Sequence, residues 1–111
     1  MNTGTSQQQD ELTGLSTRKV FHETLDGILE KYKGTDTPLS LAFIDIDNFF
    51  RINEQFGHTA GDHVLKSLAE MLKLASGSDG LPCRYGGDEF VIIFPGVERE
   101  QAFLAIEKMR L

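Results

Sequence analysis

Two adjacent glycines between two β-prone segments constrain the fold of this 111-residue chain more than any other feature. The segment Cys83–Tyr85 precedes the Gly-Gly-Asp-Glu sequence at residues 86–89, and the apolar run Phe90–Phe94 follows it. Tight turns between antiparallel strands demand positive φ, which glycine adopts at little cost. We therefore predict a β-hairpin here, with Pro95-Gly96 ending its second strand.

Apolar residues at helical spacing predict helices over residues 16–32, 48–55 and 60–74, and from about Phe103 to the end of the chain. Ser16 or Thr17 can cap the first helix, and Lys33-Gly34 ends it. Gly57 is expected to break the chain between the second and third helices. Phe49 and Phe56 are interpreted as core residues and not as a platform for stacking a base.

The run Leu39–Asp45 is almost continuously apolar and closes on a carboxylate. Such a run is typical of a central strand that is buried on both faces. The order helix, strand, two helices, hairpin, helix predicts an α/β or α+β domain around a small sheet. The apolar surface of that sheet favours a further strand after the last helix.

The composition excludes several classes of function. A net charge of -6 argues against a surface that binds DNA or RNA, although a metal ion can supply positive charge for a small phosphorylated ligand. One cysteine leaves no internal disulfide and fits a cytoplasmic protein, and neither a membrane span nor a signal peptide is found. Residues 1–9 are interpreted as a linker or an expression remnant before one domain, residues 10–111.

Acidic residues gather where the first strand and the hairpin end. Asp45 and Asp47 close the strand, and Asp88 and Glu89 lie at the hairpin tip. If the hairpin lies beside the strand, these carboxylates converge, and carboxylate clusters suit Mg²⁺. Two such ions can clamp a nucleoside triphosphate. The alternatives are solvated turn residues, a helix cap at Asp47-Asn48, and a glycine pair that only turns the chain.

The segment Arg84–Phe90 resembles the signature of the GGDEF family, bacterial diguanylate cyclases named for this pentapeptide. Residues 10–15 with Arg18, residues 43–49 and residues 53–62 resemble three further motifs of that family, in the same order. The resemblance spans residues 10–95. It implies a ferredoxin-like domain, with a central, mainly antiparallel sheet flanked by helices, related to nucleotide cyclase and polymerase palm domains.

The resemblance also implies site residues. Asp45, Asp88 and the carbonyl of Ile46 would bind Mg²⁺ or Mn²⁺, and Asp88 or Glu89 would assist deprotonation of a 3′-hydroxyl. Asn53 and Asp62 would recognise guanine, whose adjacent N–H donors a carboxylate can accept. The other implied substrate contacts are the helix start at Asn48 and Phe49, the turn residue His58, and Gly86 and Gly87, which let nucleotide approach.

The implied activity is condensation of two GTP into cyclic di-GMP with release of pyrophosphate, across a homodimer and under a regulatory sensor domain of the parent protein. A module that binds GTP or cyclic di-GMP without turnover is the alternative from another class. A fold fragment with neither property is a third reading.

This chain departs from the family pattern at several positions. Phe50 stands where a lysine is usual, and Glu54 replaces an aspartate. The family domain continues with a strand, a helix carrying basic phosphate contacts and a closing strand. The sequence up to Leu111 has no counterpart of these elements, so residues 10–111 are interpreted as a C-terminally incomplete GGDEF domain, either a fragment or a protein that lacks part of the phosphate site. The family's inhibitory product site uses Arg-x-x-Asp, but Gly77 and Gly80 occupy those positions, so no such site is expected.

Overall fold

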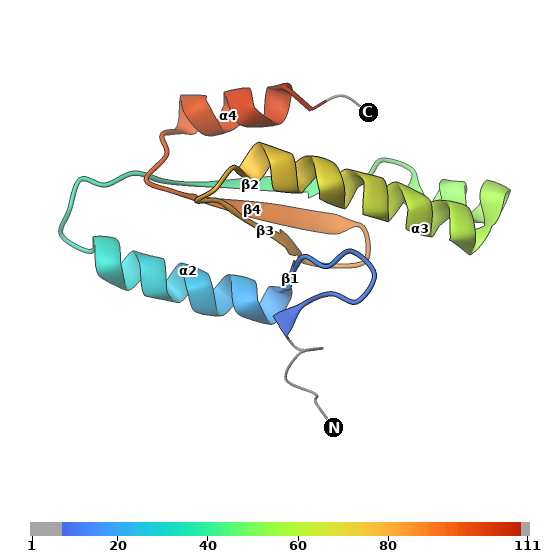
Figure 1. Ribbon diagram of the computed structural model, residues 1–111, viewed down its shortest axis with the longest axis horizontal. Helices are drawn as coiled ribbons and strands as arrows, with labels where there is room; N and C mark the ends of the chain where they lie inside the picture. The colour runs from blue at the N-terminus through green and yellow to red at the C-terminus, as the bar shows by residue number, and fades with distance from the viewer. Residues whose placement is uncertain (1–7, 110–111) are drawn as a thin grey trace.

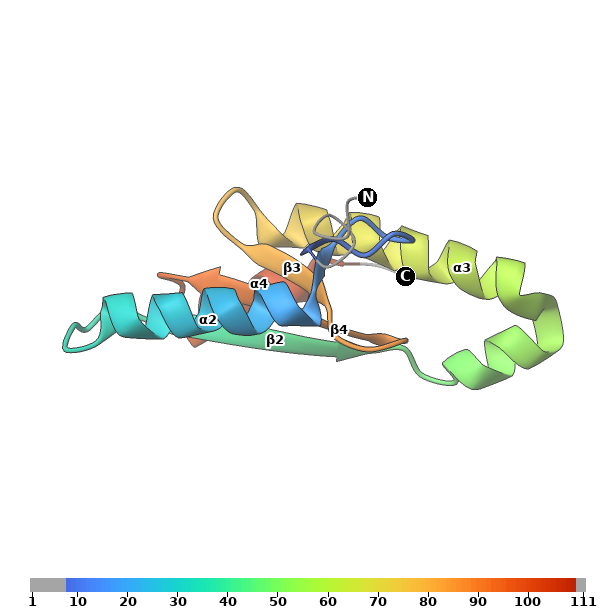
Figure 2. The ribbon, with the colours of Figure 1, turned by 90° about the horizontal axis from the view of Figure 1, so that it is seen from below.

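The computed structural model describes residues 8–109. Over this range the chain forms β1 (Ser16–Thr17), α2 (Arg18–Tyr32), β2 (Leu39–Asp45), α3 (Phe49–Ser76), β3 (Leu81–Arg84), β4 (Glu89–Pro95) and α4 (Arg99–Glu107). Helices cover both faces of one sheet (Figures 1 and 2). The mixed α+β class expected from the sequence is confirmed. The predicted linker lies mostly outside the described residues.

The sheet has the strand order β1-β3-β4-β2. β4 runs antiparallel to both of its neighbours, β3 and β2, whereas β1 pairs with β3 in parallel. The predicted hairpin is therefore present as β3 and β4. The two-residue strand β1 was not predicted.

The central strand β4 supplies both cores. Its residues Phe90–Phe94 are buried, and successive side chains point to opposite faces of the sheet. Phe90, Ile92 and Phe94 pack in the core formed with α3 and α4. Val91 and Ile93 pack with Phe21 of α2 on the other face. A strand that is apolar on both sides thus explains why helices cover both faces.

Helix α2 begins and ends as its sequence predicts. The Thr17 hydroxyl accepts a hydrogen bond from the Val20 amide at 3.4 Å, which satisfies one free N–H of the first turn. The helix ends at Tyr32 with Lys33 as its C-cap residue, and Gly34 follows with a φ of 77°, a conformation that favours glycine.

Strand β2 contradicts the prediction of a central strand. It forms an edge of the sheet over the described residues, paired only with β4. Phe43 is 64% exposed and Leu41 is 39% exposed. These two side chains are exposed because α2 packs against β1, β3 and β4 but covers little of β2. β2 is an edge because no strand within residues 8–109 pairs with its other side.

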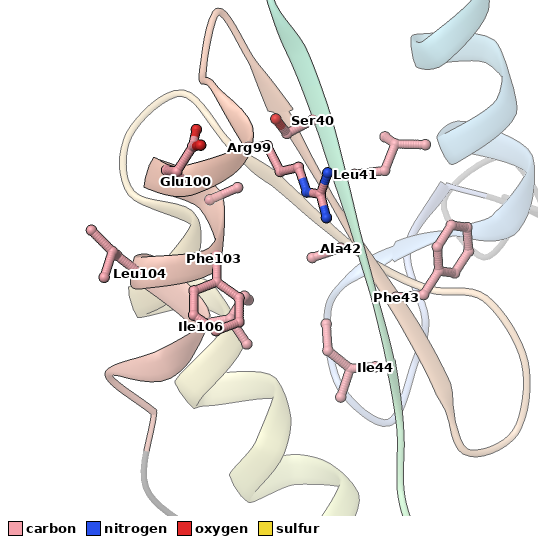
Figure 3. A pocket seen from close by; sticks show the side chains of 11 residues that line it. Ser40, Leu41, Ala42, Phe43, Ile44, Arg99, Glu100, Phe103, Leu104 and Ile106 are labelled. Carbon is pink, nitrogen blue, oxygen red and sulfur yellow. The ribbon is translucent and has the colours of Figure 1, made fainter.

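On the opposite face, a cavity of about 770 Å³ separates β2 from α4. Ala42 and Ile44 point toward α4, whereas Phe43 points to the other side of the sheet (Figure 3). Arg99 and Glu100 line the end of this cavity near the start of α4. None of the candidate site residues lines it, so this cavity is not the site predicted from the sequence.

Candidate active site

The end of β2 and the tip of the β3–β4 hairpin lie side by side. Antiparallel pairing places Asp45 opposite Glu89. The next amide, that of Ile46, donates a hydrogen bond to the carbonyl of Asp88 at 3.3 Å. Asp45 and Glu89 are exposed, and Asp88 is half-buried. The register thus gathers these carboxylates at one end of the sheet, as the sequence predicted.

The glycine pair matters at the hairpin turn because it lacks side chains, and not because it adopts positive φ angles. Neither Gly86 nor Gly87 has a positive φ, so the reason given for them from the sequence is wrong. A Cβ on Gly86 would collide with the carboxylate of Glu89, which folds back over the turn. A Cβ on Gly87 would meet nothing within 4 Å. Glycine at 86 therefore makes room for Glu89, while the surface at Gly87 stays open.

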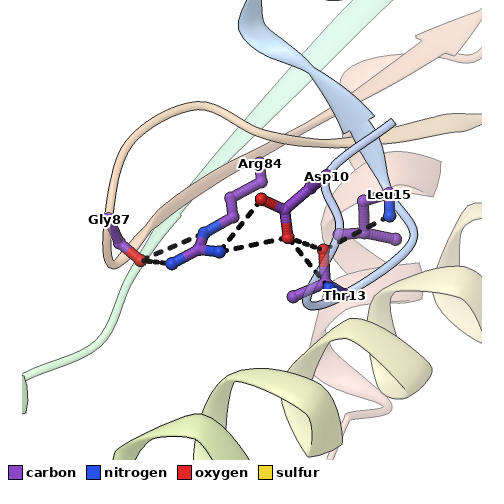
Figure 4. Close-up of polar contacts among 5 residues, drawn as sticks. All are labelled: Asp10, Thr13, Leu15, Arg84 and Gly87. Carbon is purple, nitrogen blue, oxygen red and sulfur yellow. Dashed lines mark hydrogen bonds and ion pairs between the residues drawn. The ribbon is translucent and has the colours of Figure 1, made fainter. Parts of the chain in front are cut away.

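Arg84 links this turn to the N-terminal segment (Figure 4). Its Nη2 and Nε donate to the carbonyl of Gly87 at 2.8 and 3.3 Å, and its Nη1 contacts both carboxylate oxygens of Asp10 at 3.0 Å. Asp10 also accepts from the amide and the hydroxyl of Thr13, each at 2.8 Å. Asp10 and Arg84 belong to two separate sequence motifs, and their contact was not predicted from the sequence.

The environment of Asp10 favours its charged form. Partial burial raises the pKa of its carboxyl, but the hydrogen bonds from Thr13, together with the hydrogen bond and charge of Arg84, outweigh that effect. The pKa of Asp10 consequently lies below its ordinary value of 3.8. The side chains of Arg84 and Asp10 are 19% and 21% exposed, so solvent screens this pair only in part.

Helix α3 folds back on itself at Gly57, whose φ of 88° and ψ of 167° are not helical. This is the break predicted near that residue. A Cβ on Gly61 would collide with the side-chain oxygen of Asn53 and would lie 3.4 Å from the ring of Phe49. The inside of the kink therefore places Asn53 against the residue that precedes Asp62. Those two polar side chains are the pair expected to recognise a base.

His58 and Phe56 lie next to the kink, and both are exposed to solvent. Phe56 is 69% exposed, so its prediction as a core residue is wrong. It lies directly before the kink at Gly57 and belongs to neither core cluster. Phe49, by contrast, packs against the core of α3 and α4, as predicted.

The start of α3 has an unusual backbone. Asn48 occupies the N-cap position with a φ of 60° and a ψ of 29°, the left-handed region that asparagine tolerates better than most residues. Its side chain forms no cap hydrogen bond, so it does not play the capping role considered from the sequence. The amides of the first turn, from Phe49 onward, are left for another acceptor.

Hollows flank the carboxylates on both faces of the sheet. One of about 640 Å³ lies between β2 and α3, and Asp45, Asp47 and His63 contribute to its lining. Another of about 210 Å³ is bordered by Asp45, Tyr85 and Glu89. Asp45 therefore stands at an end of β2 that is accessible from both faces.

The donor set at this end of the sheet fits a hard cation. Among residues 8–109 no group of three or more His, Cys, Asp or Glu side chains is arranged as a metal site. The set implied by the sequence is smaller: two carboxylates, those of Asp45 and Asp88, and the carbonyl of Ile46. Mg²⁺ is typically held by one or two carboxylates together with substrate phosphates and water, so these oxygen donors suit it.

Cys83 has no features of a nucleophile. It is fully buried in β3, and burial raises the pKa of its thiol to about 12. His22 lies on the surface of α2, where its Nε2 is 3.3 Å from the hydroxyl of Tyr85. A nucleophilic role for Cys83 therefore has no support in its burial or its pKa.

The family model described as "Diguanylate cyclase, GGDEF domain" matches residues 7–111. The chain belongs to the GGDEF family. The response regulator PleD of Caulobacter vibrioides is 42% identical over 104 residues, which are 92% of this chain and 22% of that protein. Diguanylate cyclase DgcP of Pseudomonas aeruginosa is 39% identical over 91% of this chain and 15% of its own length. The chain thus spans less than a quarter of either relative.

Solved GGDEF structures have the same fold. The coiled coil and GGDEF domain of DgcB from Caulobacter crescentus, in complex with c-di-GMP, gives a TM-score of 0.91 at 30% identity, over 98% of this chain and 57% of that chain. Diguanylate cyclase SiaD of P. aeruginosa, in complex with its activator SiaC, gives 0.85 at 30% identity, over 96% and 42%. The cyclase-type fold expected from the resemblance is confirmed. No helix within residues 8–109 has the length and apolar character needed to cross a membrane.

Proposed function

We propose that this GGDEF domain is a diguanylate cyclase that condenses two GTP into cyclic di-GMP and two pyrophosphates. The observation that carries the proposal is the register of β2 and β4. It places Asp45 opposite Glu89 and next to Asp88 at an open end of the sheet. An accessible group of carboxylates beside a turn that is unobstructed at Gly87 suits a nucleoside triphosphate.

Recognition of guanine is assigned to Asn53 and Asp62. The kink at Gly57 places Asn53 against Gly61, the neighbour of Asp62. Asn53 and Asp62 therefore lie on the two arms of the same kink in α3. A carboxylate accepts from the N1–H and the amino group of guanine, which adenine does not offer together. His58 is exposed beside this region and is assigned a contact at its border.

The triphosphate is assigned to the start of α3 and the hairpin turn. The uncapped amides after Asn48 and the positive end of the helix dipole favour an anion there. Asp45, Asp88 and the carbonyl of Ile46 would hold Mg²⁺ or Mn²⁺. When bound, such an ion neutralises phosphate charge and polarises the phosphorus that is attacked.

The reaction is written for two chains that face each other. The 3′-hydroxyl oxygen of each GTP forms a bond to the α-phosphorus of the other, and the bond from that phosphorus to pyrophosphate breaks. The hydroxyl proton passes to the carboxylate of Asp88 or Glu89. Each domain binds one GTP, so turnover requires a homodimer. A regulatory sensor domain in the parent protein, in the cytoplasm, would control how the two domains meet.

The test is GTP turnover by the purified protein with Mg²⁺ or Mn²⁺, followed by chromatography. Cyclic di-GMP and pyrophosphate are expected from GTP and not from ATP. The product formed per chain should rise with chain concentration below the dimer dissociation constant, because the active unit contains two chains. Calorimetric binding of GTP without product under either metal would contradict the proposal and favour a binding module.

A further inference from the structure

The hairpin turn that carries Asp88 has little packing of its own. Gly87 is exposed, and nothing lies within 4 Å of its missing Cβ position. Two backbone hydrogen bonds close the turn, from the amides of Tyr85 and Gly86 to the carbonyl of Glu89. They fix the base of the turn. Neither of them involves the carbonyl of Gly87, which belongs to the peptide that joins Gly87 to Asp88.

Arg84 supplies a partner for that carbonyl. Two of its nitrogens donate to the carbonyl of Gly87, at 2.8 and 3.3 Å. A planar guanidinium directs its donors in fixed directions, so this contact defines the orientation of the peptide plane as well as its position. The orientation of the peptide that joins Gly87 to Asp88 decides where the Asp88 backbone and carboxylate lie relative to Ile46.

Asp10 in turn fixes Arg84. Both of its oxygens lie 3.0 Å from Nη1, and Thr13, which is buried, donates two hydrogen bonds to the same carboxylate. Asp10 and Arg84 are therefore held from both sides, by an N-terminal turn and by the hairpin (Figure 4). The pair differs from the exposed pair of Lys19 and Glu23, in which each side chain is 61% exposed.

We propose that Arg84 and Asp10 are positioning residues of the active site. Through the Gly87 carbonyl they hold the hairpin tip so that Asp88 stands against Ile46 at the end of β2. The N-terminal turn of residues 10–13 thereby sets the geometry of the catalytic carboxylates without touching substrate. This inference rests on the proposed function only for its effect on turnover; the order of the turn can be measured without it.

The first test is amide hydrogen exchange in the full chain, because exchange measures local opening. The reporters are the amide of Ile46, which donates from the end of β2 to the Asp88 carbonyl, and the amide of Gly86, which donates within the turn to the Glu89 carbonyl. In Asp10→Asn and Arg84→Lys both should exchange about tenfold faster, while amides in the middle of β4 keep their rates. Lysine keeps the charge but cannot contact Asp10 and Gly87 through separate nitrogens. Glu23→Gln, which removes an exposed ion pair, is the matched control and should change neither reporter.

Unchanged exchange at both reporters would overturn the inference. So would equal acceleration throughout the sheet, because that would assign the pair to overall stability.

The second test separates binding from turnover. In both variants kcat should fall about tenfold or more, while KM and calorimetric GTP affinity stay within about twofold, since the guanine contacts on α3 do not involve the pair. A raised KM with unchanged kcat contradicts the inference. If the unmodified chain makes no cyclic di-GMP, the proposed function fails, but the exchange rates of Ile46 and Gly86 still decide whether Arg84 and Asp10 order the turn.

Discussion

At the scale of single residues, Asp45 and Asp88 can be separated from residues that only stabilise the fold. Asp45 is exposed and Asp88 half-buried, and neither belongs to the cores on β4. Replacing either by asparagine should lower GTP turnover at least about 100-fold, because a carboxylate that serves the metal and the reacting hydroxyl is lost. The melting temperature should change by only a few degrees, as for other surface substitutions.

Asp79→Asn is the matched control, since Asp79 is an exposed residue of the loop between α3 and β3, at the other end of β3 from the hairpin turn. It should retain turnover. Melting curves by circular dichroism, recorded without metal, complete the measurement. A large fall in the melting temperature of the Asp45 or Asp88 variants would assign these carboxylates to the fold instead.

The positions of the acidic residues could be predicted from the sequence, because they depend only on where nearby strands end. The acidic residues at the ends of β2 and the hairpin were found from spacing, because strand ends follow from apolar runs. The contact of Arg84 with Asp10 could not be found, because 74 positions separate the two residues. The need for Gly86 was attributed to φ, whereas the structure shows that the Glu89 side chain occupies the space of a Cβ. Such contacts depend on tertiary structure.

At the scale of elements, the kink in α3 gives a prediction about base recognition. Gly61→Ala should weaken calorimetric GTP affinity about tenfold, because the added methyl group displaces Asn53 from the inside of the kink. Gly27→Ala is the control, since a Cβ at that position on α2 meets nothing within 4 Å. It should leave GTP affinity unchanged and stabilise the helix by about 0.5–1 kcal/mol. Wild-type affinity in Gly61→Ala would place Asn53 outside the guanine pocket.

The loop between α3 and β3 carries a prediction about regulation. Gly77 ends α3 with a φ of 68°, a conformation that favours glycine, and a Cβ on Gly80 would collide with the carbonyl of Ser76. Neither position carries the arginine or the aspartate of a product site. Added cyclic di-GMP should therefore not inhibit non-competitively at fixed GTP. Progress curves at several GTP concentrations are the measurement. Inhibition that persists at saturating GTP would reveal a product site on another surface.

Element positions were predictable where a segment has its own pattern. Helices α2 and α3, the break at Gly57 and the β3–β4 hairpin all follow from periodicity and glycine placement. The edge position of β2 did not, because an apolar run does not reveal which strand neighbours it. Two-residue β1 is too short to carry any period, and its pairing with β3 depends on the N-terminal turn.

At the scale of the whole molecule, the contact between Arg84 and Asp10 connects the candidate site to the stability of the fold. It ties the N-terminal turn to the hairpin, next to the short strand β1 at the far edge of the sheet. The pair is mostly buried, unlike the exposed helix pairs at Lys19 and Lys73. It should therefore contribute to unfolding free energy in a way that depends on the charge of Asp10.

The sign of that dependence follows from the lowered pKa of Asp10. A carboxyl whose pKa is lower in the folded chain stabilises the fold fully above its ordinary value of 3.8 and loses this contribution as the pH falls below it. At neutral pH, Asp10→Asn should lower the unfolding free energy by about 1 kcal/mol, the amount reduced by partial solvent screening. Below about pH 4 the difference from wild type should shrink, because wild-type Asp10 is then protonated and, like asparagine, uncharged.

Urea titrations between pH 3 and 7 measure this difference in unfolding free energy. Glu23→Gln, at the exposed pair, is the control and should stay within about 0.5 kcal/mol of wild type at neutral pH. A difference between Asp10→Asn and wild type that stays constant across this range would mean that the charge of Asp10 adds nothing to folding, and that its hydrogen bonds alone stabilise the N-terminal turn.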